Sequence, residues 1–385
     1  MSIRRTRVAF LCLEAPREGQ ASYTHVHEIV AGLVQSGWDV RLCKPPHSDR
    51  WQRPGIARRI LSYAAMQLRF LLVIPRVDIV YIRAHPLAAL AAFGALLFRR
   101  PVFHEVNGPY GDVFLAHPGA ARFRRLITGL QRWQYRHATG LIAVTEGLVR
   151  WVQEESGGRP TTLVSNGANT EMFSPAATTG HSLPPRYAVF AGGLTVWHGV
   201  DMMRAAVSDP AWPEDLPLVV AGDGPKRPEV EAAARETGRV VALGVVPYRE
   251  VPGIMAGACV GLVPITDPDG RSSLGGVAPL KLFELMACGV PVVVTDLRGQ
   301  ADLVRAEQCG LVVPVGDGHA LAEAVRTLAA DSEGARAMGE RGCAAVRARH
   351  SWAERARETR AFIEACLQSA RGRRPAPSRR ADSSR

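Results

Sequence analysis

Short apolar runs alternate with helix-length segments along most of the chain. Continuous apolar runs predict strands buried in a parallel sheet, and the helical segments between them predict βαβ units. The expected strands cover residues 8–13, 39–42, 78–83, 102–106, 141–144 and 162–165, and then 187–191, 216–221, 240–243, 260–264, 291–295 and 311–313. This order predicts an α/β protein with two Rossmann-like domains, each a doubly wound parallel sheet.

The best candidate for a linker is the segment 173–185, which contains three prolines and a glycine among Ser and Thr. It predicts an N-terminal domain over 1–180 and a C-terminal domain over 181–355. The chain then turns helical, with helices expected at 319–330, 333–348 and 352–369. We expect 356–370 to form a C-terminal helix that packs back on the N-terminal domain. Six Arg and one Asp make 371–385 a basic tail of disordered composition.

Composition indicates a soluble globular protein, since 47% of the 385 residues are apolar and 22% are charged. The longest apolar stretch, 86–98, is shorter than the roughly 18–20 residues that cross a bilayer, so it predicts a buried helix. Seven cysteines are scattered singly without a CxxC pair, which favours a reducing cytoplasm.

Much of the formal charge of +11 comes from arginines in the N-terminal half. They lie beside apolar and aromatic residues in two runs, Arg50, Arg53, Arg58, Arg59, Arg69 and Arg76, then Arg122, Arg124, Arg125, Arg132 and Arg136. Such a pattern suits an anionic membrane surface, with a solvated basic face as the alternative. It contains no recognised motif for binding nucleic acid, so we expect no nucleic-acid partner.

The strongest local signal is PLKLFELMACGVPVVVTD, at residues 279–296. Lys281 and Glu284 are three residues apart and share one helix face, after a loop that contains Gly275 and Gly276. A cation at a helix start suits a phosphate, and a carboxylate suits the two hydroxyls of a ribose. The alternative is an ion pair on a helix surface.

Two glycine loops follow strands of the C-terminal half. In the first, Gly192 and Gly193 permit close approach of a ligand to the backbone, and His198 opens the next helix. The second is the turn Gly222, Asp223 and Gly224, for which a tight turn without ligand is the alternative.

Two segments of the N-terminal half also end strands with polar groups. Gly19 lies in the loop between the first strand and its helix, which suits contact with a phosphate or sugar. His104, Glu105 and Asn107 end the fourth strand, and we expect them to point toward the cleft between the domains. The alternative for His104 is a structural role.

In this order the segments resemble the retaining glycosyltransferase family 4, whose GT-B fold has two Rossmann-like domains facing across a cleft. The resemblance extends to about residue 369 and rests on the early glycine loop, residues 165–169, the Gly-Asp-Gly-Pro turn and above all residues 284–293. It implies a nucleotide-diphosphate sugar as co-substrate, with no metal and no other cofactor. The acceptor would be a sugar, polysaccharide or lipid-linked sugar, reached from the inner face of the cytoplasmic membrane.

Three positions depart from the family pattern. The first glutamate of its Glu-x7-Glu motif falls at Gly276, and its Arg and Lys that hold the diphosphate fall near Gly193 and at His198. A subgroup of the family has Trp-His-Gly and Lys-x-x-Glu instead, as here. Lys281, assisted by His198 and Arg271, would then supply the charge for the diphosphate, and Glu284 would bind the ribose.

The resemblance also implies a mechanism without a protein nucleophile, in which the acceptor attacks from the side of the leaving group. His104, Glu105 and Asn107 would orient the donor sugar or the acceptor hydroxyl, and Lys281 would stabilise the departing diphosphate. Two alternatives stay open: a non-hydrolysing nucleotide-sugar epimerase, and a degenerate sugar-nucleotide binder. A nicotinamide dehydrogenase is disfavoured because no GxGxxG follows any expected strand.

Overall fold

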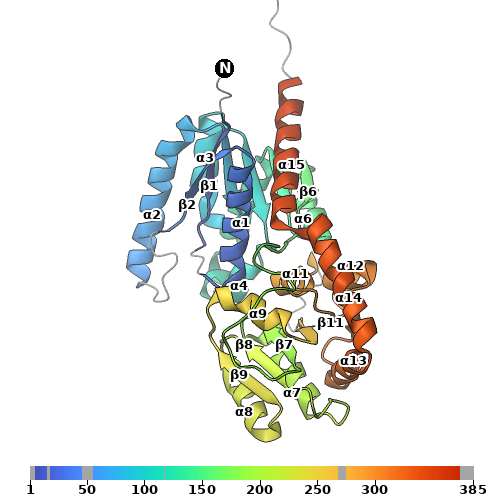
Figure 1. Cartoon of the computed structure of the whole chain (residues 1–385). Coiled ribbons are helices and arrows are strands. Elements are labelled where there is room, and N and C mark those ends of the chain that lie inside the picture. The colour runs from blue at the N-terminus through green and yellow to red at the C-terminus, as the bar shows by residue number, and fades with distance from the viewer. Residues whose placement is uncertain (1–4, 15–17, 46–54, 117, 268–274, 373–385) are drawn as a thin grey trace, which may run out of the picture.

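The computed structural model describes residues 5–14, 18–45, 55–116, 118–267 and 275–372. Figure 1 shows two α/β domains stacked end to end, each built on one six-stranded parallel sheet. The expected fold class is confirmed, and each of the twelve expected strands is present.

The N-terminal sheet has the order β2-β1-β3-β4-β5-β6. Its strands are β1 Arg7–Leu11, β2 Asp39–Cys43, β3 Ile79–Arg83, β4 Val102–Val106, β5 Gly140–Ala143 and β6 Thr161–Leu163. Its helices are α1 Ala21–Gln35, α2 Ile56–Val73, α3 Ala89–Leu97, α4 Asp112–Ala116, α5 Arg124–Arg136 and α6 Glu146–Ser156, with short 3-10 turns at Ile74–Arg76, Pro86–Ala88 and Pro118–Phe123. The helix α1 covers one face of the sheet, while α2, α3, α5 and α6 cover the other.

The C-terminal sheet has the order β12-β11-β10-β7-β8-β9. Its strands are β7 Ala188–Ala191, β8 Leu218–Ala221, β9 Val240–Gly244, β10 Val260–Val263, β11 Val292–Thr295 and β12 Gly310–Val313. Between and after them lie η4 Val196–His198, α7 Val200–Ser208, α8 Arg227–Thr237, η5 Tyr248–Glu250, α9 Val251–Ala256, α11 Leu280–Ala287, α12 Gln300–Glu307, α13 Gly318–Ala330, α14 Ser332–Ala345 and the π-helical turn η6 Val346–His350.

Strand order locates the place where a ligand would bind in each sheet. Read from β9, the C-terminal sheet has the Rossmann order 3-2-1-4-5-6, which reverses between β7 and β10. The N-terminal sheet has the order 2-1-3-4-5-6 and reverses between β1 and β3. Open α/β sheets bind ligands outside the carboxyl ends of the strands at such points. The loops after β7 and β1 are therefore the places to examine.

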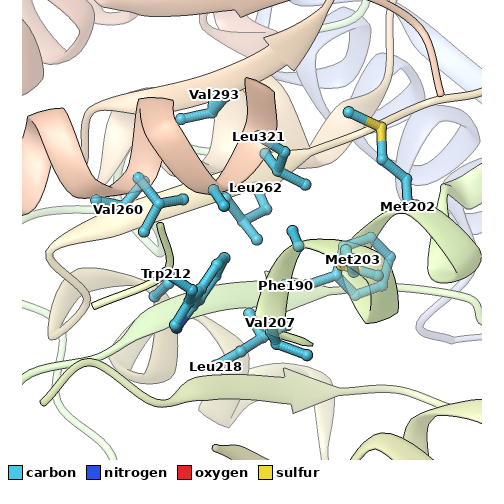
Figure 2. Close-up of a cluster of buried hydrophobic side chains, with 14 of the residues drawn as sticks. Phe190, Met202, Met203, Val207, Trp212, Leu218, Val260, Leu262, Val293 and Leu321 are labelled. Carbon is cyan, nitrogen blue, oxygen red and sulfur yellow. The ribbon is translucent and has the colours of Figure 1, made fainter. Parts of the chain in front are cut away.

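The core of the C-terminal domain is built from the apolar runs that predicted its strands. Figure 2 shows Phe190 of β7 and Leu262 of β10 packed with Trp212 and with Met203 of α7. Trp212 is 1% exposed, and its ring nitrogen donates to the carbonyl oxygen of Leu216 at 2.8 Å. Burial of whole aromatic side chains on this scale contributes about 1.5–3 kcal/mol each and stabilises the sheet behind the glycine loops.

The apolar stretch 86–98 is helical, but the expectation that it is buried was wrong for one of its faces. Small residues of α3, such as Ala91 and Ala95, pack on the sheet and are fully buried. The large apolar side chains of the same stretch are exposed, with Phe93 at 55% and Leu97 at 67%. Hydropathy alone does not say which face of a helix a sheet covers. In the described part of the chain, no helix has both the length and the apolar character needed to cross a membrane.

The chain changes domain earlier than the proline-rich segment predicts. Phe173 is 1% exposed and belongs to the core of the C-terminal domain, and a Cβ on Gly253 of α9 would touch the backbone of Thr178. The segment 173–185 therefore lies along the C-terminal domain. Its prolines mark irregular backbone but not the place where the domains divide.

The helix α15, Trp352–Gly372, returns to the N-terminal domain and runs beside α1 (Figure 1). Trp352 is 3% exposed within the N-terminal core, and Arg360 donates to the carbonyl oxygen of Ser36 at 2.6 Å. The two crossing segments pair, because Ala168 accepts from the backbone of Trp352 at 3.1 Å and donates to His350 at 3.0 Å. The C-terminal crossing thus falls at 350–352, ahead of residue 356.

Candidate functional site

Loops from the carboxyl ends of both sheets meet at the boundary between the domains. Asn166, which follows β6, donates its side-chain amide to the carbonyl oxygen of Ala278 at 2.6 Å. A Cβ on Gly275 would lie 3.3 Å from Leu148 of α6. The backbone that leads into α11 is thereby held against the N-terminal domain.

Lys281 is buried beneath the glycine loop that follows β7. Its side chain comes from the first turn of α11 and is 8% exposed. A Cβ on Gly192 would lie 2.7 Å from the Lys281 ammonium, which also lies 3.8 Å from the centre of the Phe190 ring. Only a bare backbone permits this approach, and Gly192 has a φ of +144° that favours glycine.

The Lys281 ammonium has no hydrogen-bond partner among the described residues. Burial lowers the pKa of Lys281 to about 7, although the nearby Glu284 acts to raise it. A buried cation without a partner is costly, and such groups are normally paired. The arrangement is therefore suited to binding an anion.

Glu284 lies one turn further along α11 and is also 8% exposed. Its Oε1 accepts a hydrogen bond from the Tyr248 hydroxyl at 2.9 Å. Burial raises the pKa of Glu284 to about 7, while Tyr248 and Lys281 act to lower it. Both side chains are interior, so the reading of Lys281 and Glu284 as a surface ion pair was wrong.

His198 borders the same loop from η4. Its Nδ1 lies 2.5 Å from the carbonyl oxygen of Gly193 and 3.0 Å from the Thr195 hydroxyl. Burial, with a further contribution from Lys281, lowers the pKa of His198 to about 3. A neutral ring that donates from Nδ1 leaves Nε2 as an acceptor, so His198 shapes the loop without adding positive charge.

The second glycine turn supports the first. A Cβ on Gly222 would lie 1.9 Å from the carbonyl oxygen of Gly192, and one on Gly224 would lie 2.3 Å from that of Leu194. Asp223 is exposed and accepts from the backbone of Gly224 at 2.8 Å. These glycines let two loops pack backbone to backbone, which is the tight-turn alternative for this segment.

Gly276 has a left-handed backbone with φ +70°, and a Cβ there would lie 2.8 Å from the carbonyl oxygen of Arg298. The absent glutamate of the family motif therefore coincides with a backbone that disfavours any side chain. Arg271, expected to assist Lys281, lies outside the described residues.

In the N-terminal domain, Glu105 is the centre of a buried network. Its carboxylate accepts from Arg83 at 2.6 Å, from Asn107 at 2.8 Å and from the Tyr81 hydroxyl at 2.9 Å. His25 of α1 lies 2.9 Å from the same carboxylate. Burial acts against the charge, but these partners together hold the pKa of Glu105 far below its ordinary value.

His104 does not share this location. Adjacent residues of a strand point to opposite faces of the sheet, so His104 lies on the side of α5, edge-on to Tyr135 with ring centres 5.9 Å apart. It is 0% exposed, and burial lowers its pKa to about 3. The expectation that His104 points toward the cleft was wrong, while Asn107 lies beside Glu105.

Gly19 lies just before α1 with φ +83°.

Several residues of these two clusters gave no signal in the sequence. Tyr248 begins the short 3-10 turn η5 after β9, and Thr24 and His25 lie within an ordinary amphipathic helix. Arg83 ends an expected strand, and its charge at that position is the one signal that could have been used. Among the described residues, no group of three His, Cys, Asp or Glu is placed to hold a metal ion.

Comparison with known proteins gives a family match over both domains. Residues 23–172 match the family model described as Glycosyltransferase Family 4, and residues 185–331 match the one described as Glycosyl transferases group 1. The first match spans most of the N-terminal domain, and the second includes Gly192, Lys281 and Glu284.

Curated relatives match over about half of their own length. The 2-deoxystreptamine glucosyltransferase of Streptomyces kanamyceticus is 27% identical over 54% of this chain and 55% of its own. The phosphatidyl-myo-inositol mannosyltransferase of Mycobacterium leprae is 27% identical over 58% of each chain.

Solved structures share the whole fold. Sucrose-phosphate synthase from Thermosynechococcus elongatus superposes with a TM-score of 0.73 at 18% identity, over 95% of this chain and 100% of its own. The HepE protein of Anabaena, in complex with UDP-glucose, gives a TM-score of 0.66 at 17% identity over 95% and 100%.

Proposed function

We propose that this chain, a glycosyltransferase by its matches to the models Glycosyltransferase Family 4 and Glycosyl transferases group 1, transfers a sugar from a nucleotide-diphosphate sugar to an acceptor. Transfer would proceed with retention of anomeric configuration and without a metal ion or another cofactor. The donor would occupy the C-terminal domain, at the point where its strand order reverses.

The single observation that carries this proposal is the Lys281 ammonium, buried without a hydrogen-bond partner in the described structure and directly below Gly192. A diphosphate on the bare backbone of Gly192 and Gly193 would supply the missing anion. Glu284, on the same face of α11, would accept the ribose hydroxyls. The two side chains would then bind opposite ends of one activated sugar.

Catalysis would consist of stabilising the leaving group. Negative charge develops on the diphosphate as the bond to the sugar breaks, and Lys281 and the loop amides are placed where that charge appears. We assign no protein nucleophile, so the acceptor hydroxyl would attack from the leaving-group side and pass its proton to a phosphate oxygen. Asn107 and Glu105 would act indirectly, by ordering the side of the cleft that the N-terminal domain forms.

A thermal-shift screen against nucleotide sugars tests the donor site. We expect one nucleotide sugar to raise the melting temperature of the wild-type protein and to have no such effect on Lys281→Ala. A ligand at about 100 times its Kd contributes about 2.7 kcal/mol, which is easily detected. An equal shift in both proteins would contradict the proposal.

A degenerate sugar-nucleotide binder is the second candidate, and the absent side chain at Gly276 favours it. It predicts that the donor binds without turnover across many acceptors. An epimerase would instead alter the sugar of the donor when no acceptor is present. Incubation with donor alone and then with an acceptor panel separates the three activities.

The acceptor we propose is a sugar or polysaccharide, or a lipid-linked sugar at the inner face of the cytoplasmic membrane. The described N-terminal domain exposes large apolar side chains on α2, α3, α5 and the turns next to them, and α3 contacts both α2 and α5. The apolar strip, as we call it, comprises Leu61, Leu68, Leu72, Leu87, Leu90, Phe93, Leu97, Phe98, Phe123 and Leu126. Soluble monomers rarely expose large apolar patches that serve no interaction.

The same helices and the turns next to them also carry exposed arginines, namely Arg58, Arg69, Arg76, Arg99, Arg122, Arg124, Arg125, Arg132 and Arg136. Apolar side chains flanked by arginines match an anionic lipid surface, where each basic residue contributes about 1 kcal/mol. A nucleic acid would match the charge but not the apolar strip.

Flotation with vesicles of phosphatidylcholine and phosphatidylglycerol tests the membrane surface. We expect the protein to float with anionic vesicles at low salt, and Phe93→Ser with Leu97→Ser to abolish flotation. Retention of binding by this double variant, or binding to neutral vesicles alone, would overturn the proposal. A protein that elutes as a dimer, with the strip protected, would identify a second copy as the occupant.

A further inference from the structure

A chain of two hydrogen bonds, which links the side chains of Thr24, Tyr248 and Glu284, crosses the boundary between the domains. Thr24 of α1 donates to the Tyr248 oxygen at 3.4 Å, and Tyr248 donates to Glu284 Oε1 at 2.9 Å. The direction is fixed, because the Glu284 carboxylate only accepts and therefore uses the single proton of Tyr248. The Tyr248 oxygen is then left to accept from Thr24.

The three side chains of this hydrogen-bonded chain are held in place by burial and packing. Thr24 is 6% exposed, and the Tyr248 ring packs against Phe173 with ring centres 5.8 Å apart. The Glu284 carboxylate is also buried, with Lys281 on its own helix and Tyr248 and Glu28 facing it from other elements. In a buried setting, successive hydrogen bonds of this kind strengthen one another.

The hydrogen bond from Tyr248 has two consequences for Glu284. It fixes which way one carboxylate oxygen points, and it favours the ionised form against the cost of burial. An ionised and oriented carboxylate is what a pair of ribose hydroxyls requires. The N-terminal domain contributes to this arrangement through Thr24 alone among the residues that the described structure hydrogen-bonds to Tyr248.

We infer that Tyr248 is a positioning residue for the ribose-binding Glu284, and that Thr24 of the other domain completes it. Donor affinity then depends on how the two domains are apposed, although Lys281 and Glu284, the side chains proposed to bind the donor, belong to the C-terminal domain. The inference rests on the proposed donor site and adds to it a residue that does not itself touch the donor.

The test is Tyr248→Phe, which keeps the ring and removes the hydroxyl. We would measure calorimetric binding of UDP, GDP, ADP and dTDP to the full chain from pH 5.5 to 8.5. We expect the best nucleotide to bind about tenfold more weakly to Tyr248→Phe near pH 7, since Glu284 loses the hydrogen bond that orients its carboxylate. The acid side of its binding profile should also move to higher pH, because Glu284 loses a partner that favours ionisation. Thr24→Val should change both quantities in the same direction by less.

Tyr187→Phe is the matched control, because Tyr187 donates to the carbonyl oxygen of Ile254 at 2.8 Å in the same domain, away from Glu284. It should lower stability without moving the pH profile. Tighter binding by Tyr248→Phe would mean that the hydroxyl competes with the donor, and an unchanged profile would mean a purely structural role; either result overturns the inference. If the wild-type protein binds none of the four nucleotides, the proposed function itself fails.

Discussion

Each domain buries a charged side chain near the carboxyl end of its sheet, with opposite results. At the carboxyl end of β4, the Glu105 carboxylate is surrounded by Arg83, His25, Asn107 and Tyr81. In α11, beneath the loop that follows β7, the Lys281 ammonium has no hydrogen-bond partner in the described structure. Burial is similar, so it does not distinguish the two clusters.

What distinguishes them is whether the protein itself satisfies the charge. A saturated cluster stabilises the fold and has no capacity left for a ligand, whereas a buried unpaired cation costs stability until an anion arrives. Removing charge should therefore harm stability in the N-terminal domain and activity in the C-terminal domain.

The largest effect should follow from Glu105→Ala. Arg83 and His25 would stay buried without their shared partner, and breaking a buried pair typically costs about 3–5 kcal/mol. Urea denaturation would measure the free energy of unfolding, with the isosteric Glu105→Gln expected to lose less. A stable but inactive Glu105→Ala would break the comparison by making Glu105 a site residue.

The next effect should come from Lys281→Met. Removing a group that stabilises developing charge typically lowers kcat by about 10²–10³-fold. The free energy of unfolding should stay level or rise, because an unpaired buried cation is lost. Arg326→Met, which breaks an exposed pair with Glu323, is the control and should leave activity unchanged. A large loss of stability with normal kcat would reverse our assignment of the two clusters.

The fold could be predicted because strands buried on both faces are continuous apolar runs. The residues of β7 and β11 are buried throughout, and nearly all of them are apolar. The face of α3 that meets the sheet could not be predicted, since Ala91 and Phe93 are both apolar and only packing separates them.

The donor site was predictable only where its residues are close in sequence. Lys281 and Glu284 share a helix face, so their spacing is informative. Tyr248 reaches Glu284 from the 3-10 turn η5 after β9, and Thr24 comes from another domain, so no local pattern contains them. The placement of His104 was a different failure, because the period of two along a strand separates it from Glu105.

A third prediction concerns the acid that the family motif has and this chain lacks. Gly276→Glu should give no gain in activity and should lower stability by about 1–3 kcal/mol, because the backbone is left-handed and the Arg298 carbonyl oxygen lies close. Gly276→Ala shares the backbone strain without the carboxylate. Chemical denaturation and an activity assay on both would separate the two effects, and a more active Gly276→Glu would show that the loop adapts.

A fourth prediction uses pH to separate the clusters. Donor binding needs Lys281 protonated and Glu284 ionised, and burial moves both pKa values to about 7. Affinity should therefore be greatest near pH 7, falling on the acid side as Glu284 gains a proton and on the alkaline side as Lys281 loses one, by up to about tenfold per pH unit. Lys281→Arg should abolish the alkaline decline, since Arg stays charged. Calorimetric titrations that show identical profiles for both proteins would contradict the assignment.

The smallest effect should follow from His104→Phe, which separates His104 from its neighbour Glu105. Burial lowers the His104 pKa from 6.5 to about 3, so the unfolded chain binds the proton more readily between those values. Stability of the wild-type protein should thus decrease as the pH falls below about 6.5, and His104→Phe should lack this contribution. At pH 7.5 the variant should keep its activity and change stability by less than about 1.5 kcal/mol, because an aromatic ring still packs on Tyr135. Unfolding free energies at pH 5 and 7.5 would measure the difference. A stable variant that has lost activity would show that His104 takes part in the reaction.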